Sequence, residues 1–278
     1  MFIPRPCDYS TIEPQFLHNF MKNLKRTRSY VAQADSKAFC CSMTIDELES
    51  ENMHGAISWI RRFEDVVDDY GSLVDRLKRA HMEWYENKPS ELAEIGTMMN
   101  PDDRMFYVLF PTPTFINQRI IGLNRINEDD DINLIHALLN SIISIFYIEA
   151  VGFGRGLGAL DISKDSISKC FMLNPSLLNE NQRSDIMDRF TALMSRGIVD
   201  INQDLEDPVR REFDMAVLNA FGIGRYFDNI VSSLKAMRKV RKAVKQHTVE
   251  LRPLRGFDRQ EPLREMVIGL AAESEYDN

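Results

Sequence analysis

The stretch Asn140-Ser-Ile-Ile-Ser-Ile-Phe-Tyr-Ile-Glu-Ala-Val-Gly-Phe-Gly-Arg-Gly-Leu-Gly-Ala-Leu-Asp161 decides how the middle of this chain folds. Apolar residues cover most of its first half and of the preceding residues from Leu134 onward, which is typical of a helix buried in a core. Asp131 is suited to cap that helix. The sequence therefore predicts one buried helix, a glycine-rich turn and a short extended segment. The glycines of the turn stand at Gly152, Gly154, Gly156 and Gly158.

The glycine-rich turn superficially resembles the S-adenosylmethionine-binding turn of methyltransferases, in which an acidic residue precedes a Gly-x-Gly pair. Glu149 stands in the acidic position. A cofactor turn of this kind follows a buried strand and opens a helix, whereas this turn follows a helix and leads into an extended segment. We therefore interpret its four glycines as loop-forming residues. A divergent, self-contained methyltransferase is the alternative.

Upstream of this stretch, Phe16, Phe20 and Leu24 recur every four residues, which predicts a short amphipathic helix. A basic patch of Lys22, Lys25, Arg26 and Arg28 overlaps its end. Further along, Thr44-Ile-Asp-Glu47 has the pattern of a capping box and predicts that a helix begins there.

A small sheet is expected between these helices and the glycine-rich turn. Residues 105–110 and 115–123 have strand-like apolar patterns, and we expect Pro111 and Pro113 to separate them into two strands. Asn117, Gln118 and Arg119 lie inside the second of these patterns.

Helices are predicted in the last third of the chain. Asn179 or Asn181 is expected to begin a helix through Met194, and Asp207 followed by Pro208 begins another through Phe221. A long helix is predicted over residues 226–246. Together the elements predict an α+β protein that is mainly helical, with a small mixed sheet in the middle and a helical C-terminal part.

We expect four regions along the chain. They are a mostly helical region at 1–95, an α/β core at 96–178, a helical region at 179–250, and a tail at 251–278 that is basic and then acidic.

The composition is that of a soluble globular protein, with 44% hydrophobic and 27% charged residues among 278. No apolar run is long enough to span a bilayer and the first residues lack a signal-peptide pattern, so we expect a cytoplasmic protein without membrane contact. The four cysteines form no CxxC pair and are interpreted as reduced thiols. The five histidines lack metal-ligand spacing, so no metal site is expected.

Charge is segregated along the sequence. Residues 225–264 hold eleven Lys or Arg against four Asp or Glu, a local charge of +7 in a chain of −8, which leaves −15 elsewhere. The basic side of the long helix is a candidate for sequence-independent phosphate contacts, and the alternative is a solvated helix face. Its apolar side is a candidate docking face for a catalytic partner. The basic residues are Lys235, Arg238, Lys239, Arg241, Lys242 and Lys245, and the apolar ones are Phe227, Ile230, Leu234 and Met237.

No catalytic residue is expected in this chain. Enzymes that methylate amino groups of bases use Asn/Asp/Ser-Pro-Pro followed by an aromatic residue that stacks on the flipped base. Asn174-Pro-Ser-Leu177 and Asn100-Pro-Asp-Asp103 lack both the second proline and the aromatic residue, so we interpret them as turns.

The order of the elements resembles the C-terminal target-recognition region of adenine-specific (N6) DNA methyltransferases of restriction–modification and type IIG-like systems. The resemblance covers residues 101–245. It is carried by a strand ending in Phe115-Ile-Asn-Gln-Arg119, a helix ending in Ala137-Leu-Leu-Asn-Ser141, the glycine-rich stretch ending in Leu160-Asp161, Leu173-Asn-Pro175, Asp207-Pro-Val-Arg-Arg-Glu-Phe-Asp214, and Leu218-Asn-Ala-Phe-Gly222.

The resemblance implies a DNA target-recognition, or specificity, component that binds double-stranded DNA and is itself non-catalytic. It implies that S-adenosylmethionine binds to a separate methyltransferase subunit of a restriction–modification or phage-defence system. An interaction or regulatory subunit that keeps the recognition fold is an alternative. Arg suits guanine and Asn or Gln suit adenine, so the candidates for base reading are Asn117, Gln118, Arg119 and Arg155. In the alternative interpretation, Asn117 and Gln118 stabilise the sheet edge and Arg155 pairs with a local carboxylate.

Overall fold

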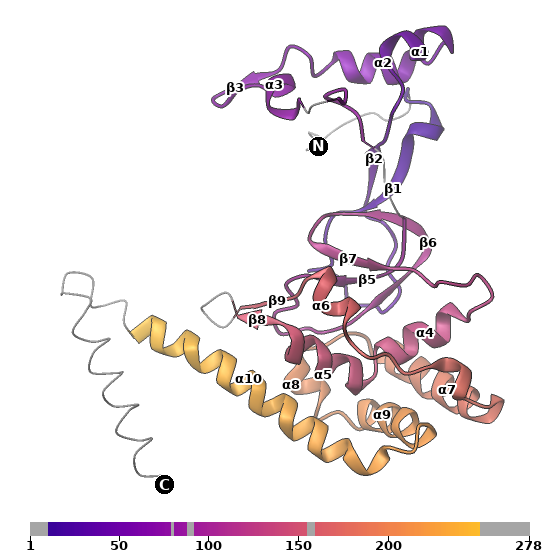
Figure 1. Ribbon diagram of the computed structural model, residues 1–278, viewed down its shortest axis with the longest axis vertical. Helices are drawn as coiled ribbons and strands as arrows, with labels where there is room; N and C mark the ends of the chain where they lie inside the picture. Colours follow the sequence, from indigo (N-terminus) through magenta and orange to yellow (C-terminus); the bar gives the residue numbers. More distant parts are fainter. Residues whose placement is uncertain (1–10, 79–80, 88–91, 155–158, 251–278) are drawn as a thin grey trace.

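The computed structural model describes residues 11–78, 81–87, 92–154 and 159–250, with side chains as far as residue 243. Figure 1 shows a helical unit at the N-terminal end, a sheet in the middle, and the C-terminal helices packed at the other end. The predicted α+β class is confirmed: a five-stranded mixed sheet lies between helical parts.

The central sheet has the strand order β2-β1-β6-β5-β7. Strands β1 and β6 pair in parallel, whereas β1 with β2, β5 with β6, and β5 with β7 are antiparallel. The strands are β1 (Leu17–Met21), β2 (Ser36–Phe39), β5 (Ala93–Met98), β6 (Val108–Ile116) and β7 (Ile120–Leu123).

The predicted helix through Phe16, Phe20 and Leu24 is wrong, because Phe16 ends the short helix η1, Phe20 lies in β1, and Leu24 lies in the loop that follows β1. Phe20 pairs with Ser36 in one neighbouring strand and with Phe115 in the other. Its ring also lies 5.5 Å from the Phe115 ring. Phe20 thus lies between two strands that bond to the backbone of β1, and a four-residue repeat this short does not outweigh that pairing.

The prediction that Pro111 and Pro113 separate two strands is also wrong, since both lie within β6. The register between β5 and β6 shifts between Ala93 and Ile95, opposite the segment that holds the prolines. Proline has no amide hydrogen and is tolerated where the ladder is interrupted.

The apolar stretch from Leu134 to Ile148 forms two helices instead of one. Helices α4 (Ile132–Leu139) and α5 (Ile142–Val151) meet at an angle of 58°. The backbone becomes extended at Ser141, and Asn140 before it is bonded to Tyr107: its side-chain oxygen accepts the Tyr107 N–H at 2.9 Å, and its amide donates to the Tyr107 carbonyl at 3.0 Å. Asp131 caps α4 as predicted, accepting the N–H groups of Asn133 and Leu134.

Among the described residues, no single helix is long and apolar enough to cross a membrane, although the bent pair of α4 and α5 meets that test jointly.

The predicted helix starts in the last third are confirmed. Asn179 forms a capping box with Gln182 at the start of α7 (Glu180–Arg196), and Asp207 caps α9 (Pro208–Ala220). The long helix is α10 (Phe227–Glu250). The remaining elements here are β8 (Phe153–Gly154), β9 (Leu160–Asp161), α6 (Lys164–Ser168), α8 (Ile201–Asp204), η2 (Pro175–Leu177) and η3 (Gly224–Tyr226).

The N-terminal helical unit has its own small core around Trp59, Phe63 and Leu48. The capping box at Thr44 and Glu47 is confirmed, with the Thr44 N–H donating to Glu47 at 2.7 Å. In the described part of the chain Cys40, Cys41 and Cys170 are free thiols; Cys7 lies outside it. The elements of the unit are η1 (Pro14–Phe16), α1 (Ile45–Ser50), α2 (His54–Arg61), β3 (Val67–Asp68), β4 (Gly71–Ser72) and α3 (Leu73–Leu77).

His136 is buried beside the hydrogen bonds between Asn140 and Tyr107, and it makes the stability of the fold depend on pH. Its Nε2 lies 2.9 Å from the Tyr107 carbonyl, and its ring meets Phe190 edge-on. Burial lowers the pKa of His136 to about 4, so the folded protein holds it neutral where the unfolded chain protonates it.

We expect this histidine to weaken the fold as pH falls from about 6.5 to about 4, because only the unfolded state gains the proton in that window. The free energy of unfolding is expected to fall by about 3 kcal/mol by pH 4, and this loss is absent above pH 6.5. Urea denaturation of the wild type and of His136→Gln across this range measures it. Other titrating groups cancel in the difference, so a constant difference between the two proteins would disprove the assignment.

Candidate nucleic-acid interface

The basic patch seen in the sequence folds into an anchored loop, residues 22–29, which we call the basic loop. Its carbonyl groups face the protein: Arg104 donates to the carbonyls of Lys25 and Thr27, the latter at 2.6 Å. The Ile198 N–H donates to the Arg28 carbonyl at 2.7 Å. Leu24 is fully buried beneath the loop. With the backbone held inward, the side chains of Lys25, Arg26 and Arg28 are exposed to solvent.

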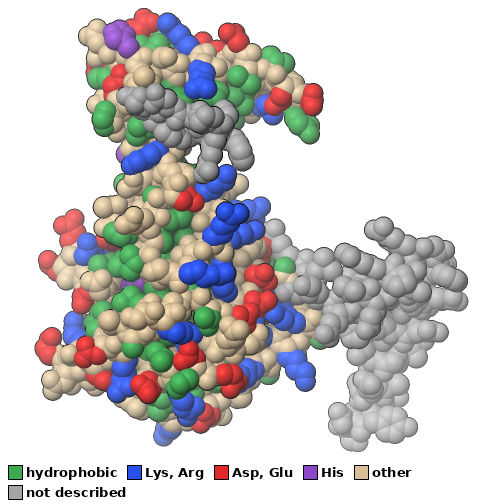
Figure 2. All heavy atoms as spheres, turned by 180° about the vertical axis from the view of Figure 1, so that it is seen from behind, with side chains coloured by type: hydrophobic (Ala, Val, Ile, Leu, Met, Phe, Trp, Pro, Cys, Tyr) green, Lys and Arg blue, Asp and Glu red, His purple; other side chains and the backbone are tan. Residues whose placement is uncertain are grey.

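The basic loop forms one wall of a surface groove, which we call the basic groove. Two adjoining hollows of about 540 and 680 Å³ share Lys25, Met98, Asn100 and Asp102. Four cations from separate parts of the chain line it: Lys25, Arg28, Arg104 and Arg119. Figure 2 shows Lys and Arg side chains gathered in the middle of one face, below the N-terminal helical unit.

The charge of the groove is not neutralised from within. Burial and then the nearby charge of Arg28 lower the pKa of Arg104, so two like charges lie close together. Among the described residues, no carboxylate lies within ion-pairing distance of Lys25, Arg28 or Arg119.

Three acidic residues also line the groove: Asp102, Asp103 and Asp200. Asp103 pairs with Arg238 and Lys242, and Asp200 caps α8. Burial raises the pKa of Asp103, but its bonds to Lys242 and Arg238 hold the value below its ordinary level. Among the described residues that line the groove, only Asp102 remains as an exposed acid without such a role, so cations dominate this described lining.

The predicted base-reading residues 117–119 form the turn between β6 and β7. The Asn117 side chain accepts the Arg119 N–H at 3.0 Å, and the backbone N–H of Asn117 donates to the Met21 carbonyl at 3.1 Å. Asn117 therefore shapes the turn, in line with its alternative structural interpretation. Gln118 and Arg119 are exposed, and Arg119 lines the basic groove.

Gly152, the first glycine of the glycine-rich turn, joins α5 to β8, which pairs with β9 in a small hairpin. A Cβ on Gly152 would lie 2.4 Å from Leu160 Cδ1 and 2.9 Å from the Ile148 carbonyl, so this glycine allows the hairpin to pack against the helix. The order of helix, turn and hairpin does not fit a cofactor turn. Ala159 and Leu160, which follow the turn, line the basic groove. Arg155, Gly156 and Gly158 lie outside the described residues, and Gly154 is described and exposed.

The expectation that the basic side of α10 contacts phosphate is corrected for two residues. Arg238 is 3% exposed and bonds to Asp103 at 3.0 Å. The Arg241 side chain is 9% exposed and holds Glu149 through two bonds of 2.6 and 2.9 Å. These guanidinium groups fasten α10 to α5 and to the turn that holds Asp103.

The other basic residues of α10 differ in their surroundings. Lys242 pairs with Asp103, and Lys235 pairs with Glu206 at 2.5 Å at an exposed site. Lys239 is exposed. The side chain of Lys245 lies outside the described residues.

The predicted docking face of α10 is likewise covered by the protein itself. Phe227 and Leu234 are buried in the core formed by α5, α9 and the sheet, and Ile230 packs against that core. Met237 is half-buried. This apolar side is needed for the fold and is not free for a partner.

Two motifs that carry the sequence resemblance meet inside the core. Asp214 accepts the N–H of Ile142, the first residue of α5, at 2.8 Å. Arg210 bonds to Asp214 at 2.8 Å and lies 3.4 Å from Asp204. Asn140, one residue before the α5 N-cap, forms two hydrogen bonds with the backbone of Tyr107. These motif residues therefore build the scaffold and do not reach the basic groove.

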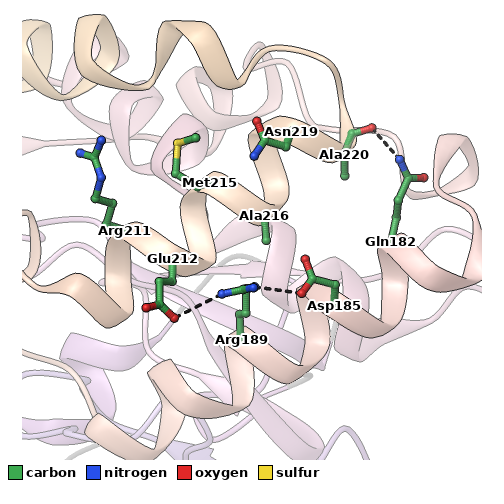
Figure 3. A pocket seen from close by; sticks show the side chains of 9 residues that line it. All are labelled: Gln182, Asp185, Arg189, Arg211, Glu212, Met215, Ala216, Asn219 and Ala220. Carbon is green, nitrogen blue, oxygen red and sulfur yellow. Dashed lines mark hydrogen bonds and ion pairs between the residues drawn. The ribbon is translucent and has the colours of Figure 1, made fainter.

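A separate hollow, of about 490 Å³, lies between α7 and α9 (Figure 3). Arg189 spans it, bonding to Asp185 at 2.9 Å and to Glu212 at 3.2 Å. Gln182 donates to the Ala220 carbonyl at 3.1 Å. Because these polar groups satisfy one another, the hollow is a weaker candidate than the basic groove.

Comparison with known proteins gives one structural likeness to report. No family model matches this sequence, and no curated protein matches it. Superposition covers 85% of this chain and 27% of a solved enzyme, with a TM-score of 0.47 and 11% identity. The fold resembles part of the type IIG restriction endonuclease BpuSI. The likeness to BpuSI concerns the fold, so no residue of this chain takes a role from that enzyme.

Within residues 11–78, 81–87, 92–154 and 159–250, no group of three or more His, Cys, Asp or Glu is placed to hold a metal ion.

The basic patch is visible in the sequence, but its spatial proximity to Arg119 and to Arg104 is not. The parallel pairing of β1 with β6 makes the connection, because it places Met21 beside Ile116 and so joins the two following loops. A pairing across almost a hundred residues leaves no local signal in the sequence. Arg104 directly follows the turn at residues 100–103, and nothing in the local sequence distinguishes it as a binding residue.

Gly197 supports the basic loop and provides a test of its anchoring. The residue has a φ of +83°, and a Cβ there would lie 2.8 Å from the Arg28 carbonyl. We expect Gly197→Ala to destabilise the fold by about 1–3 kcal/mol and to displace the loop. Gly222→Ala is the matched control, with a φ of +71° and open space around the added methyl. Urea denaturation compares them; equal losses would show that the contact with Arg28 does not matter.

Proposed function

We propose that this chain is the DNA target-recognition part of a bacterial N6-adenine DNA methyltransferase system of the restriction–modification or phage-defence kind. The observation that carries the proposal is the basic groove, in which Lys25, Arg28, Arg104 and Arg119 converge and the described residues provide no ion-pairing carboxylate for the three exposed ones. The chain is non-catalytic in this proposal. S-adenosylmethionine and the transfer of its methyl group belong to a separate catalytic subunit, in the same cytoplasm.

The groove has the chemistry that DNA binding requires. Exposed Lys and Arg neutralise phosphates and release counterions, which supplies most of the sequence-independent affinity. Sequence is read by side chains that reach base edges with paired hydrogen-bonding groups. Lys25 and Arg28 suit the first role, and Gln118 and Arg119, at the tip of the β6–β7 turn, suit the second. The chain's charge of −8 does not oppose this, because the basic loop contains four cations and no acid.

Selection from a pool of random DNA duplexes tests the recognition function. We expect the wild type to enrich a defined sequence, and Gln118→Ala to relax the choice of base at one position while leaving backbone affinity nearly intact. Glu64→Ala, at an exposed site in the N-terminal helical unit, is the control and should enrich the wild-type sequence. Enrichment of no sequence by the wild type, with or without its catalytic subunit, would rule the proposal out.

The second candidate is an interaction or regulatory subunit that keeps the recognition fold without binding DNA. The acidic N-terminal helical unit favours it, because excess negative charge repels DNA. This candidate predicts a protein complex with no measurable DNA affinity in either component.

A further inference from the structure

We propose that the β3–β4 hairpin of the N-terminal helical unit docks onto a protein whose surface is apolar in the centre and bordered by Lys and Arg. On the function proposed above, this surface belongs to the catalytic methyltransferase subunit. The inference thus rests on that function for the identity of the partner, but not for the chemistry of the contact.

The hairpin presents large apolar side chains to solvent. Val67 is 72% exposed, Tyr70 is 82% exposed, and Val66 beside them is 39% exposed. Figure 1 shows β3 at the outer end of the N-terminal unit, away from the central sheet. Isolated apolar residues on a surface are ordinary, but here two valines lie beside a tyrosine, a residue type enriched among the anchors of protein interfaces.

The hairpin is held in one conformation. Its Tyr70 N–H donates to Asp68 at 2.9 Å, and the Leu73 N–H donates to the Val66 carbonyl at 2.9 Å. Arg76 holds Asp68 at 2.6 Å, and Gly71 provides the left-handed turn with a φ of +97°. An anchor that is ordered before binding loses little conformational entropy when it docks.

Charge around the hairpin selects the kind of partner. Residues 44–86 contain eleven Asp or Glu against five Lys or Arg, a net charge of −6. At the hairpin itself, Glu64, Asp65 and Asp69 are exposed, and the described residues offer them no ion pair. Figure 2 shows apolar and acidic side chains together at this outer end. DNA is repelled here, whereas a basic rim on a protein is complementary.

The chain has a second exposed apolar surface, formed by Phe171 at 79% and Leu177 at 71% exposure. On both surfaces two large apolar side chains are more than 70% exposed. The acidic surround distinguishes the hairpin, so this second surface supplies the matched control.

The test measures binding of the purified chain to the methyltransferase encoded beside it, by titration calorimetry. We expect Val67→Ser with Tyr70→Ser to weaken the complex at least about thirtyfold, and Phe171→Ser with Leu177→Ser to change it less than about twofold. Glu64→Lys with Asp69→Lys should weaken it about tenfold at low salt and much less at high salt. All substitutions are at exposed sites, and thermal melting confirms that each variant is folded.

Absence of a complex, an unchanged affinity of the Val67/Tyr70 variant, or a loss confined to the Phe171/Leu177 variant would each overturn the inference. Dissociation of a homodimer in place of the mixed complex would overturn it as well. DNA binding is a separate readout, since the hairpin variants should keep the wild-type DNA affinity. If the wild type binds the methyltransferase through the hairpin but never binds DNA, the proposed function fails and the docking surface remains.

Discussion

Replacing Arg28 and Arg119 together by glutamate is expected to weaken DNA binding roughly hundredfold at low salt. Each side chain lines the basic groove and has no ion-pairing carboxylate among the described residues, so its charge is available to phosphate or to a base edge. A charge-assisted hydrogen bond contributes about tenfold or more in affinity. Fluorescence anisotropy with a labelled duplex measures the loss.

The control for this pair is Arg62→Glu with Lys78→Glu, which changes the net charge equally at exposed positions in the N-terminal helical unit. We expect it to weaken binding only a few-fold, through the long-range field, and that effect to vanish as salt is raised. If both pairs lost the same affinity, binding would depend on total charge alone and the groove would have no special role.

Replacing Asp214 by alanine is expected to destabilise the fold by about 3–5 kcal/mol. The carboxylate is 1% exposed and is held by Arg210, itself 2% exposed, and by the Ile142 N–H. Burial raises the pKa of Asp214 to about 6, so it is ionised at pH 7.5. Removing it leaves a buried guanidinium with only Asp204 nearby and leaves the first N–H of α5 without its acceptor. Urea denaturation at pH 7.5 measures the loss.

Asp185→Ala removes the same kind of ion pair, with Arg189 four residues away, at a half-exposed site between α7 and α9. It should cost less than about 1 kcal/mol. Replacing Arg210 and Asp214 together by leucine should recover much of the loss, because no buried charge is then left without its partner. A loss for Asp214→Ala as small as that for Asp185→Ala would contradict the assigned role of the Arg210–Asp214 pair.

The sequence was informative wherever a local rule decides the structure. Asn179, Asp207, Asp131 and Thr44 each cap a helix as their side chains predict, since capping depends on bonds that span only two or three residues. The apolar face of α10 was also recognised, but its partner was not. A periodic face predicts burial without specifying whether the protein's own core or another chain covers it.

Contacts distant in the sequence could not be predicted. Phe20 lies in a strand because Ser36 and Phe115 are beside it, and its own neighbours gave a helical repeat. Arg238 and Arg241 resemble a phosphate-binding helix face until Asp103 and Glu149 are placed against them. The basic groove has the same origin: its cations come from three loops that the pairings of β1 with β6 and of β5 with β7 bring together.

The salt dependence of DNA binding tests the central claim most directly. The wild-type chain is titrated with a random-sequence duplex at several salt concentrations, starting at about 50 mM. Three exposed groove cations predict a slope of about −3 in a plot of log affinity against log salt concentration. The Arg28→Glu, Arg119→Glu variant should lower that steepness by about 2. No binding at the lowest salt, or a slope that the variant leaves unchanged, would contradict the assignment of the basic groove as the DNA-binding surface.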